Sequence, residues 1–543
     1  MWQVSNEANW WRNAVTYHIY TRSFFDSDGD GNGDLNGVTA KMDYLAHLGV
    51  DAIWLAPFFT SPANDQGYDP ASYHKVDPKF GNNADLCHLV DTAHHHNIRV
   101  ILDLVVNHTS DQHPWFRHAL AMQTRRIQSG YDWARDPLAN VYVFRPADPA
   151  APDQPPNNWK HFMGDEPAWS KTATGEWYLH RFTPHQPDLD LRNPLVRRHF
   201  GKIAQRWVCD QKIDGIRIDV LDHVFHDREL RDFSAVLDPP GSHYLDCWNW
   251  HERYLMEDEA AEFAGELSHA IHSANHDAVI ISELHYSERV ADFGYLIRFL
   301  EQGNDLPFNF SLIGQDARVW KRAIDRYLSA LPEGACPNFV LSNHDQIIRL
   351  ADKFGSNFRA VLMALLCLGN TGGSHIFLYN GDEIGMVNGD SINSSNMVDP
   401  VGLLQGVAMS RDHLRTGLTW RRDAKNAGFS TSDAPWLPGG QTLDGNGIDE
   451  QMIDPNSLLT LVRDIIGLRK QHMALQFGQY IPVDCGDDMF CFERQMGEQR
   501  FYLMCNFSDQ TKPLPTTGTL IHTTSQIPVM DMLQPHEGRI VIH

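Results

Sequence analysis

The chain of 543 residues lacks several features that would assign it to a class at once. No uninterrupted apolar run reaches the about 18 residues that a membrane span requires. The first eleven residues show no basic flank followed by an apolar core, so we expect no signal peptide. Lys and Arg number 45 against 69 Asp and Glu, giving a formal net charge of -24. This argues against nucleic-acid or anionic-membrane partners, because both need a basic surface.

Cysteine is also sparse and scattered. The eight cysteines form no CxxC pair, and several lie inside apolar runs. Such usage predicts reduced, buried thiols and a cytoplasmic location rather than a disulfide framework. Hydrophobic residues make up 42% of the chain, which is ample for a large core, and the length predicts two to four domains.

An acidic loop near the start of the chain is the first chemical signal. Acidic side chains alternate with glycine and serine between Asp26 and Asp34, which is how a chain wraps a hard cation. The pattern differs from an EF-hand, because Gly37 stands at the twelfth position and a strand leads in. We expect one structural Ca²⁺ or Mg²⁺ here, and the alternative is an empty acidic turn. The expected ligands are Asp26, Asp28, Asp30, the Asn32 carbonyl and Asp34.

Apolar strands and amphipathic helices alternate over most of the chain. Repeated strand–helix units imply a parallel sheet, and their number predicts a closed (β/α)8 TIM barrel, an α/β fold. The helices are expected over 38–48, 85–96, 200–211 and 458–472. The strands are expected over 14–20, 52–56, 100–108, 214–223, 278–283, 306–310, 339–345 and 376–379.

Two stretches break this rhythm. Residues 109–180 contain six prolines between Pro137 and Pro156, which argue against long helices, so we expect an irregular inserted B domain after strand 3. It would lie on the face where barrel active sites form. Residues 473–543 alternate in polarity and predict a C-terminal antiparallel β-sandwich domain. The barrel itself would comprise 1–108 and 181–472.

Three predicted strands end in a carboxylate: Asp219, Glu283 and Asp345. Strand tips of one barrel converge on one rim, so these acids should meet. Arg217 shares a strand face with Asp219, and we expect it to keep that carboxylate ionised. Glu283 follows an apolar strand that favours its protonated form. A structural ion pair is the alternative for the fourth strand alone, while a histidine–carboxylate metal site lacks HxxxH or HxH spacing.

Two carboxyls with opposite protonation predict glycoside cleavage. Asp219 would attack the anomeric carbon, and Glu283 would protonate the leaving oxygen and later activate water. Asp345 and His344 would grip ring hydroxyls in the distorted transition state. His108 would donate to a further hydroxyl.

These segments resemble the α-amylase family, glycoside hydrolase family thirteen, over nearly the whole chain. The resemblance implies a (β/α)8 barrel and a retaining mechanism, with Asp219 as nucleophile, Glu283 as acid/base and Asp345 as transition-state stabiliser. The four matching segments, in order, are Asp103-Leu-Val-Val-Asn-His108, Asp214-Gly-Ile-Arg-Ile-Asp219, the Glu283 strand end and Asn343-His-Asp345.

Within that family the chain is similar to the oligo-1,6-glucosidase and α-glucosidase branch, through Gln186-Pro-Asp-Leu-Asp190, the acidic loop and Gly381-Asp-Glu-Ile-Gly-Met386. The resemblance implies that Asp65 pairs with Arg415 around the 4-hydroxyl of a terminal glucose, while Tyr68 stacks beneath it. Such a clamp implies exo-action on short substrates. The chain departs from the branch at Asp190, where Asn is usual, and at Ser282, where Gly is common.

The resulting prediction is a retaining α-glucosidase acting on small α-glucosides, which include α-1,6-linked ones. The alternative is a glucosyltransferase or isomerase of the same family, of the trehalose synthase or sucrose isomerase type. A third reading is a non-catalytic binding subunit, which would be expected to lose these carboxylates and to carry a membrane helix. The sequence shows neither.

Overall fold

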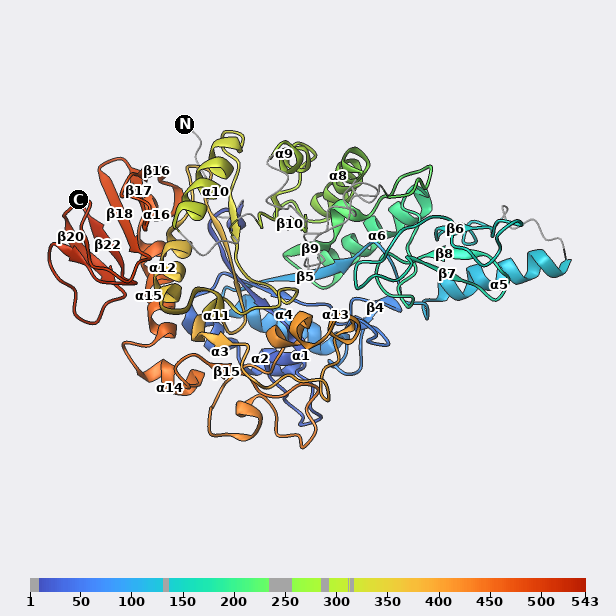
Figure 1. Ribbon diagram of the computed structural model, residues 1–543, viewed down its shortest axis with the longest axis horizontal. Helices are drawn as coiled ribbons and strands as arrows, with labels where there is room; N and C mark the ends of the chain where they lie inside the picture. The colour runs from blue at the N-terminus through green and yellow to red at the C-terminus, as the bar shows by residue number, and fades with distance from the viewer. Residues whose placement is uncertain (1–8, 130–135, 234–255, 285–292, 311, 313–316) are drawn as a thin grey trace.

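A parallel sheet of eight strands forms the centre of the molecule (Figure 1), in a computed structural model that describes residues 9–129, 136–233, 256–284, 293–310, 312 and 317–543. The strand order is β11-β10-β9-β5-β2-β1-β13-β12, and every ladder in it is parallel. The strands are β1 (Val15–Ile19), β2 (Ala52–Leu55), β5 (Arg99–Val105), β9 (Gly215–Asp219), β10 (Val279–Ser282), β11 (Leu306–Pro307), β12 (Asn338–Val340) and β13 (His375–Tyr379). The predicted barrel is confirmed.

One joint of the barrel is made by a side chain. No ladder joins β11 to β12 among the described residues. Instead the Asn338 amide donates to the Pro307 carbonyl at 2.7 Å and accepts from the Asn309 backbone at 3.1 Å. A buried amide thus supplies the donor and acceptor that a strand neighbour would otherwise provide.

Amphipathic helices cover the outside of the sheet (Figure 1). In α6, Phe200, Ile203, Ala204 and Trp207 recur at helical spacing and are buried. Helix 38–48 was predicted as one piece, but it is kinked at Lys41 into α2 and α3. The helices around the barrel are α1 (Thr21–Phe24), α2 (Leu35–Ala40), α3 (Met42–Leu48), α4 (Asn83–His95), α6 (Pro194–Asp210), α8 (Glu257–Ala274), α9 (Gly294–Glu301), α10 (Ala317–Ala330), α11 (Leu350–Phe354), α12 (Phe358–Cys367), α13 (Pro400–Gln405), α14 (Ile448–Ile453) and α15 (Leu458–Gln471).

The segment between β5 and α6 is an excursion at one end of the molecule (Figure 1). It opens with a 16-residue helix, α5 (Pro114–Ser129), so the prediction that long helices are absent was wrong: Pro114 stands at the first position of the helix, where proline is tolerated, and the next proline is Pro137. A three-stranded antiparallel sheet in the order β6-β8-β7 follows. Its strands are β6 (Phe144–Arg145), β7 (Trp169–Lys171) and β8 (Trp177–Leu179).

The C-terminal part is antiparallel, as predicted. A five-stranded sheet has the order β16-β17-β18-β22-β20, and a two-stranded sheet pairs β19 with β21. Helix α12, buried along its whole length, lies between barrel helix α15 and strands β18 and β22. The strands are β16 (Gln479–Val483), β17 (Met489–Met496), β18 (Gln499–Asn506), β19 (Lys512–Pro513), β20 (Thr519–Thr523), β21 (Met532–Leu533) and β22 (Gly538–Ile542). The helix α16 (Met473–Phe477) leads into it.

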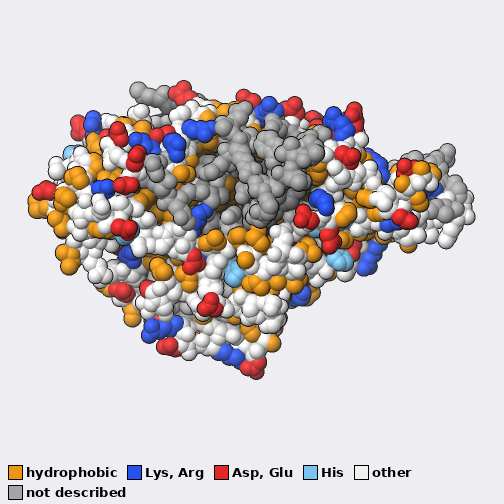
Figure 2. All heavy atoms as spheres, viewed as in Figure 1, with side chains coloured by type: hydrophobic (Ala, Val, Ile, Leu, Met, Phe, Trp, Pro, Cys, Tyr) orange, Lys and Arg blue, Asp and Glu red, His pale blue; other side chains and the backbone are white. Residues whose placement is uncertain are grey.

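The cysteines, the helices and the charged side chains bear on three expectations from composition. The seven cysteines within the described ranges are all free. No helix formed by the described residues is both long enough and apolar enough to cross a bilayer. On the face drawn in Figure 2, the Lys and Arg side chains of the described residues are interspersed with Asp and Glu.

Candidate active site

Strand β9 ends at Asp219, the acid predicted at its tip, and the stretch on to His223 that was included in the predicted range is not strand. Val220 has φ 40° in the left-handed region, which is rare for a β-branched residue, and a short 3₁₀ turn over Leu221–His223 follows. This turn aims the Val220 backbone N–H at Glu283, whose Oε2 accepts it at 2.9 Å. The strained turn therefore ties the end of β9 directly to the end of β10.

Arg217 gathers three carboxylates around one guanidinium. Register places it beside Asp103 of β5. Its Nη1 lies 2.7 Å from Asp103 Oδ1 and 2.6 Å from Asp219 Oδ1, and its Nη2 lies 2.6 Å from Glu283 Oε1. All four side chains are buried. The two acids predicted to act on one bond therefore face the same space at the strand ends.

Because three carboxylates share the guanidinium of Arg217, the charges on these acids differ from those that the sequence predicted. Burial raises the pKa of Asp219 well above its usual range, and the neighbouring Glu283 and Asp103 add to this against the attraction of Arg217. Burial likewise raises the pKa of Asp103 to about 6. Arg217 alone favours the ionised form of Asp219, as predicted, but one cation serves three acids, and burial and the two neighbouring carboxyls shift the pKa the other way. Such a cluster holds protons in common.

Asp345 occupies the opposite electrostatic environment. Its Oδ1 accepts from Arg411 Nη1 at 3.0 Å and from Arg415 Nη2 at 3.2 Å, and His344 Nε2 lies 3.3 Å from Oδ2. Burial alone would raise the pKa of Asp345, but His344 and the two guanidiniums outweigh it and hold that pKa below its usual range. Asp345 is thus a fixed anion beside a cluster that retains protons.

The clamp expected between Asp65 and Arg415 uses a different arginine. Asp65 Oδ1 accepts from Arg411 Nη2 at 2.9 Å. Arg415 donates instead to the His344 carbonyl at 3.0 Å and to Asp345. Arg411 is preferred because Asp399, fully buried at the start of α13, fixes its Nη2 at 2.6 Å and its backbone N–H at 2.8 Å.

Tyr68 and His108 complete one wall. The Tyr68 ring stacks on His344 with centroids 5.0 Å apart, and its hydroxyl donates to Asp103 Oδ2 at 3.0 Å. His108 lies with Nε2 2.7 Å from the Tyr68 carbonyl and Nδ1 3.1 Å from the Asn107 amide. Both its ring nitrogens thus face protein partners, so His108 positions Tyr68 in this structure rather than presenting a donor to a sugar.

Sequence reasoning missed Arg411, Asp399 and the role of Asp103. Asp103 could have been found, because it is the inward residue of β5 at the level of Arg217. Arg411 and Asp399 lie in an irregular stretch with no periodicity. Their only sequence signal is position, close before Arg415. Trp248 and Trp250 lie outside the described residues.

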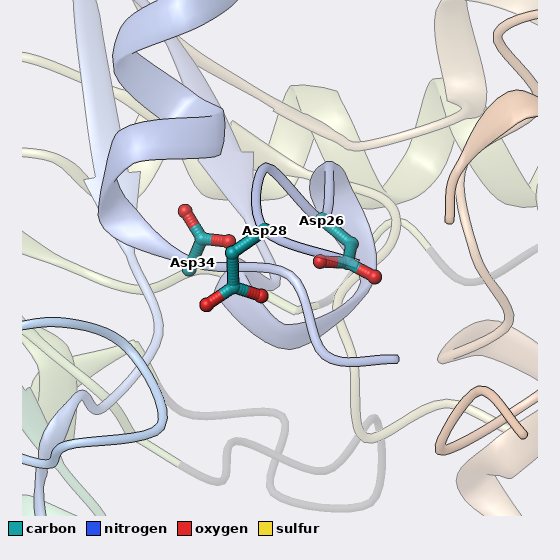
Figure 3. A group of neighbouring side chains, drawn as sticks. All are labelled: Asp26, Asp28 and Asp34. Atoms are coloured by element: carbon teal, nitrogen blue, oxygen red, sulfur yellow. The ribbon is translucent and has the colours of Figure 1, made fainter. Parts of the chain in front are cut away.

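The acidic loop brings three of its predicted ligands together. One oxygen from each of Asp26, Asp28 and Asp34 lies within 4.8 Å of the others (Figure 3). Asp30 does not join them, because its Oδ1 accepts from the Asn32 backbone and side chain at 2.7 and 3.2 Å. Three converging carboxylates on a glycine-rich turn fit a hard cation such as Ca²⁺ or Mg²⁺.

These features define the class of protein to which the chain belongs. A (β/α)8 barrel that gathers buried carboxylates at the C-terminal ends of its strands is an enzyme scaffold, and paired acids beside a fixed anion suit glycoside cleavage.

Comparison with known proteins identifies the family. Residues 18–478 match the family model described as the α-amylase catalytic domain, and the chain belongs to this family of glycoside hydrolases. It is 33% identical to a probable alpha-glucosidase of Rhizobium meliloti (strain 1021), covering 94% of this chain and 92% of that protein. It is 30% identical to an oligo-1,6-glucosidase of Parageobacillus thermoglucosidasius, covering 96% and 94%.

Solved structures agree over nearly the whole chain. The alpha-glucosyl transfer enzyme XgtA superimposes with a TM-score of 0.85 at 30% identity, covering 98% of this chain and 99% of that one. The trehalulose synthase MutB of Pseudomonas mesoacidophila MX-45 superimposes with a TM-score of 0.82 at 27% identity, covering 98% and 99%.

Proposed function

We propose that the protein is a retaining, exo-acting α-glucosidase that hydrolyses short α-glucosides through a covalent glucosyl-enzyme. The observation that carries the proposal is the sharing of Arg217 by Asp219 and Glu283, each 2.6 Å from one of its terminal nitrogens. A rigid guanidinium fork keeps two acids close enough to act on one glycosidic bond.

In the first step, Asp219 attacks the anomeric carbon as the carboxylate, while Glu283 carries the shared proton of the pair and gives it to the departing oxygen. The bond from sugar to leaving group breaks as the bond to Asp219 forms. Water, deprotonated by Glu283, then cleaves the glucosyl-enzyme. The Val220 N–H holds Glu283 in place at 2.9 Å for both proton transfers.

Asp345 acts on the developing charge. Its pKa is held low, so it is an anion when the ring acquires oxocarbenium character, and it stabilises that state electrostatically. Its anchors Arg411 and Arg415 fix its position before the substrate arrives. His344 and Tyr68, stacked on each other, form the adjacent wall, and we assign Tyr68 to contact with the sugar face.

The pair Asp65–Arg411 supports exo-action. Both side chains are only 4% exposed, and Arg411 also bonds Asp345 at 3.0 Å. A charged pair that can bond the terminal hydroxyls favours a substrate that ends there. This is why we favour short substrates, without assigning the linkage.

We further propose that Asp26, Asp28 and Asp34 hold one structural Ca²⁺ or Mg²⁺, with Asp30 and the Asn32 carbonyl as further candidate ligands. The convergence of three carboxylates supports this. When bound, the ion would cross-link the loop between α1 and α2. A cytoplasmic location is also part of the proposal, supported by the free cysteines.

A second function, glucosyl transfer or isomerisation, is favoured by one finding: XgtA and MutB, which superimpose closely, are titled as a glucosyl transfer enzyme and a trehalulose synthase. Both functions use the same glucosyl-enzyme and differ in the acceptor that takes the glucose.

The test is to incubate the enzyme with maltose, isomaltose, sucrose, trehalose and an aryl α-glucoside, and to follow products by NMR. Free glucose that appears first as the α-anomer supports retaining hydrolysis. First appearance of the β-anomer would contradict it. Disaccharide isomers that form faster than free glucose would favour the second function.

A further inference from the structure

A separate pocket lies beside the acidic loop, in the region of Figure 1 labelled α2, α3 and α14. It has a volume of about 540 Å³, within the range of small-molecule sites. None of the residues assigned above to glycoside cleavage lines it. Its walls come from the kink between α2 and α3, the segment Trp420–Thr431 and helix α14.

The pocket has an aromatic floor. Trp420 is edge-on to Phe25 and to Tyr44, with ring centroids 5.9 Å and 5.1 Å apart. The Trp420 indole N–H donates to the Phe24 carbonyl at 2.7 Å, which fixes the ring. Met452, 37% exposed, adds a flexible apolar wall. Such a surface accepts the flat apolar body of a ligand.

Lys41 places a cation on this floor. It stands at the kink between α2 and α3, and its Nζ lies 4.0 Å from the Phe25 ring centroid and 4.2 Å from that of Trp420. Burial lowers the pKa of Lys41. Throughout the described part of the chain, no carboxylate lies within 4.0 Å of its ammonium group. Two aromatic faces compensate a half-buried charge only in part, so its remaining N–H donors favour an anion.

The other charged groups of the pocket do not supply that anion. Both carboxylate oxygens of Asp26 already accept hydrogen bonds, from Gly29 and Gly31 of its own loop and from Ser430. Asp449 lies 3.6 Å from Arg421, and Lys425 is bonded to Asp433. Cations thus outnumber acids in the lining, on a chain whose formal net charge is -24.

We propose that this pocket binds a small organic anion with a flat apolar body, its carboxylate or phosphate on Lys41 and its body against Trp420 and Met452. The site is separate from the glycosidase centre, and the proposal does not depend on the proposed function. The proposal requires only that the anionic group of the ligand and its apolar body be separated by about the length of one ring.

The test is a ligand-observed NMR titration of the full-length protein with benzoate and phenyl phosphate, using benzyl alcohol as the neutral counterpart. We expect both anions to bind, and binding to weaken at least tenfold in Lys41→Met while Lys41→Arg retains it. Whichever anion binds more tightly identifies the head group. Excess 1-deoxynojirimycin, which mimics a protonated sugar, should displace neither anion.

Folding of the variants is checked by thermal melting and by cleavage of an aryl α-glucoside, which Lys41→Met should leave unchanged. The proposal is overturned if neither anion binds, if benzyl alcohol binds as tightly as benzoate, if folded Lys41→Met binds the anions as the parent does, or if 1-deoxynojirimycin displaces them.

Discussion

Replacement of Arg411 by Met provides the sharpest test of the active-site geometry. The side chain bonds Asp65 at 2.9 Å, Asp345 at 3.0 Å and Asp399 at 2.6 Å. Its removal leaves Asp399 fully buried without its cation. Breaking a buried pair in this way costs about 3–5 kcal/mol, so we expect a drop of several degrees in Tm.

Catalysis should fall as well. One charge-assisted hydrogen bond to a sugar hydroxyl contributes about 1.5–3 kcal/mol, and loosening of Asp345 adds to this loss. We therefore expect kcat/KM on p-nitrophenyl α-glucoside to fall by about 10²-fold or more. The preference for the glucoside over the α-galactoside, its 4-epimer, should shrink by about tenfold or more, because the group that reads that hydroxyl is lost.

Arg415→Met is the matched control. It removes one guanidinium from Asp345 but leaves the Asp65–Arg411 pair in place. Activity should fall, while the glucoside-to-galactoside ratio stays near that of the parent. If Arg415→Met lowers the ratio and Arg411→Met leaves it unchanged, the assignment of the clamp to Arg411 is refuted. An unchanged Tm in Arg411→Met would refute the buried-charge argument.

Three further predictions concern other parts of the molecule. Asp219→Ala and Glu283→Gln should each lower turnover of an aryl α-glucoside by several orders of magnitude with an unchanged circular dichroism spectrum; near-normal turnover in either would refute its role. Burial lowers the pKa of His180 and of His375 to about 3, so the unfolded chain binds their protons first as pH falls below about 6.5. Stability is then lost from pH 7.5 to 5 by about 2 kcal/mol for each, and His180→Gln should show a shallower fall in denaturant midpoint; an unchanged slope would contradict this. Ca²⁺ or Mg²⁺ should raise Tm, because an ion at a hundredfold excess over its Kd adds about 2.7 kcal/mol to the free energy of unfolding, and EDTA should reverse the rise. The variant Asp28→Asn should abolish this effect; an equal rise in Tm in Asp28→Asn would place the ion elsewhere.

The barrel could be predicted because its strands are short apolar runs that end in charged residues. Parallel strands buried on both faces leave that signal in the sequence, and β1, β2, β5, β10 and β13 were all found close to their observed bounds. The convergence of Asp219, Glu283 and Asp345 followed from the same rule.

The remaining features depend on tertiary contacts. The end of β9 is set by the left-handed turn at Val220, and local propensity of a valine points the other way. The choice of Arg411 over Arg415 depends on Asp399, whose position comes from the start of α13. The charge on Asp219 depends on how many acids share Arg217, which only the register of β5, β9 and β10 reveals.

The joint between β11 and β12 differs from the other joints of the barrel, because the side-chain amide of Asn338 makes it. Each of the other strand joints described is a ladder of backbone hydrogen bonds, whereas at this joint the Asn338 side chain makes two hydrogen bonds to the segment of β11. The chain that leaves β12 next carries His344 and Asp345. Among the described residues, the strand that leads to Asp345 is therefore joined to one neighbour by a backbone ladder and to the other through a side chain.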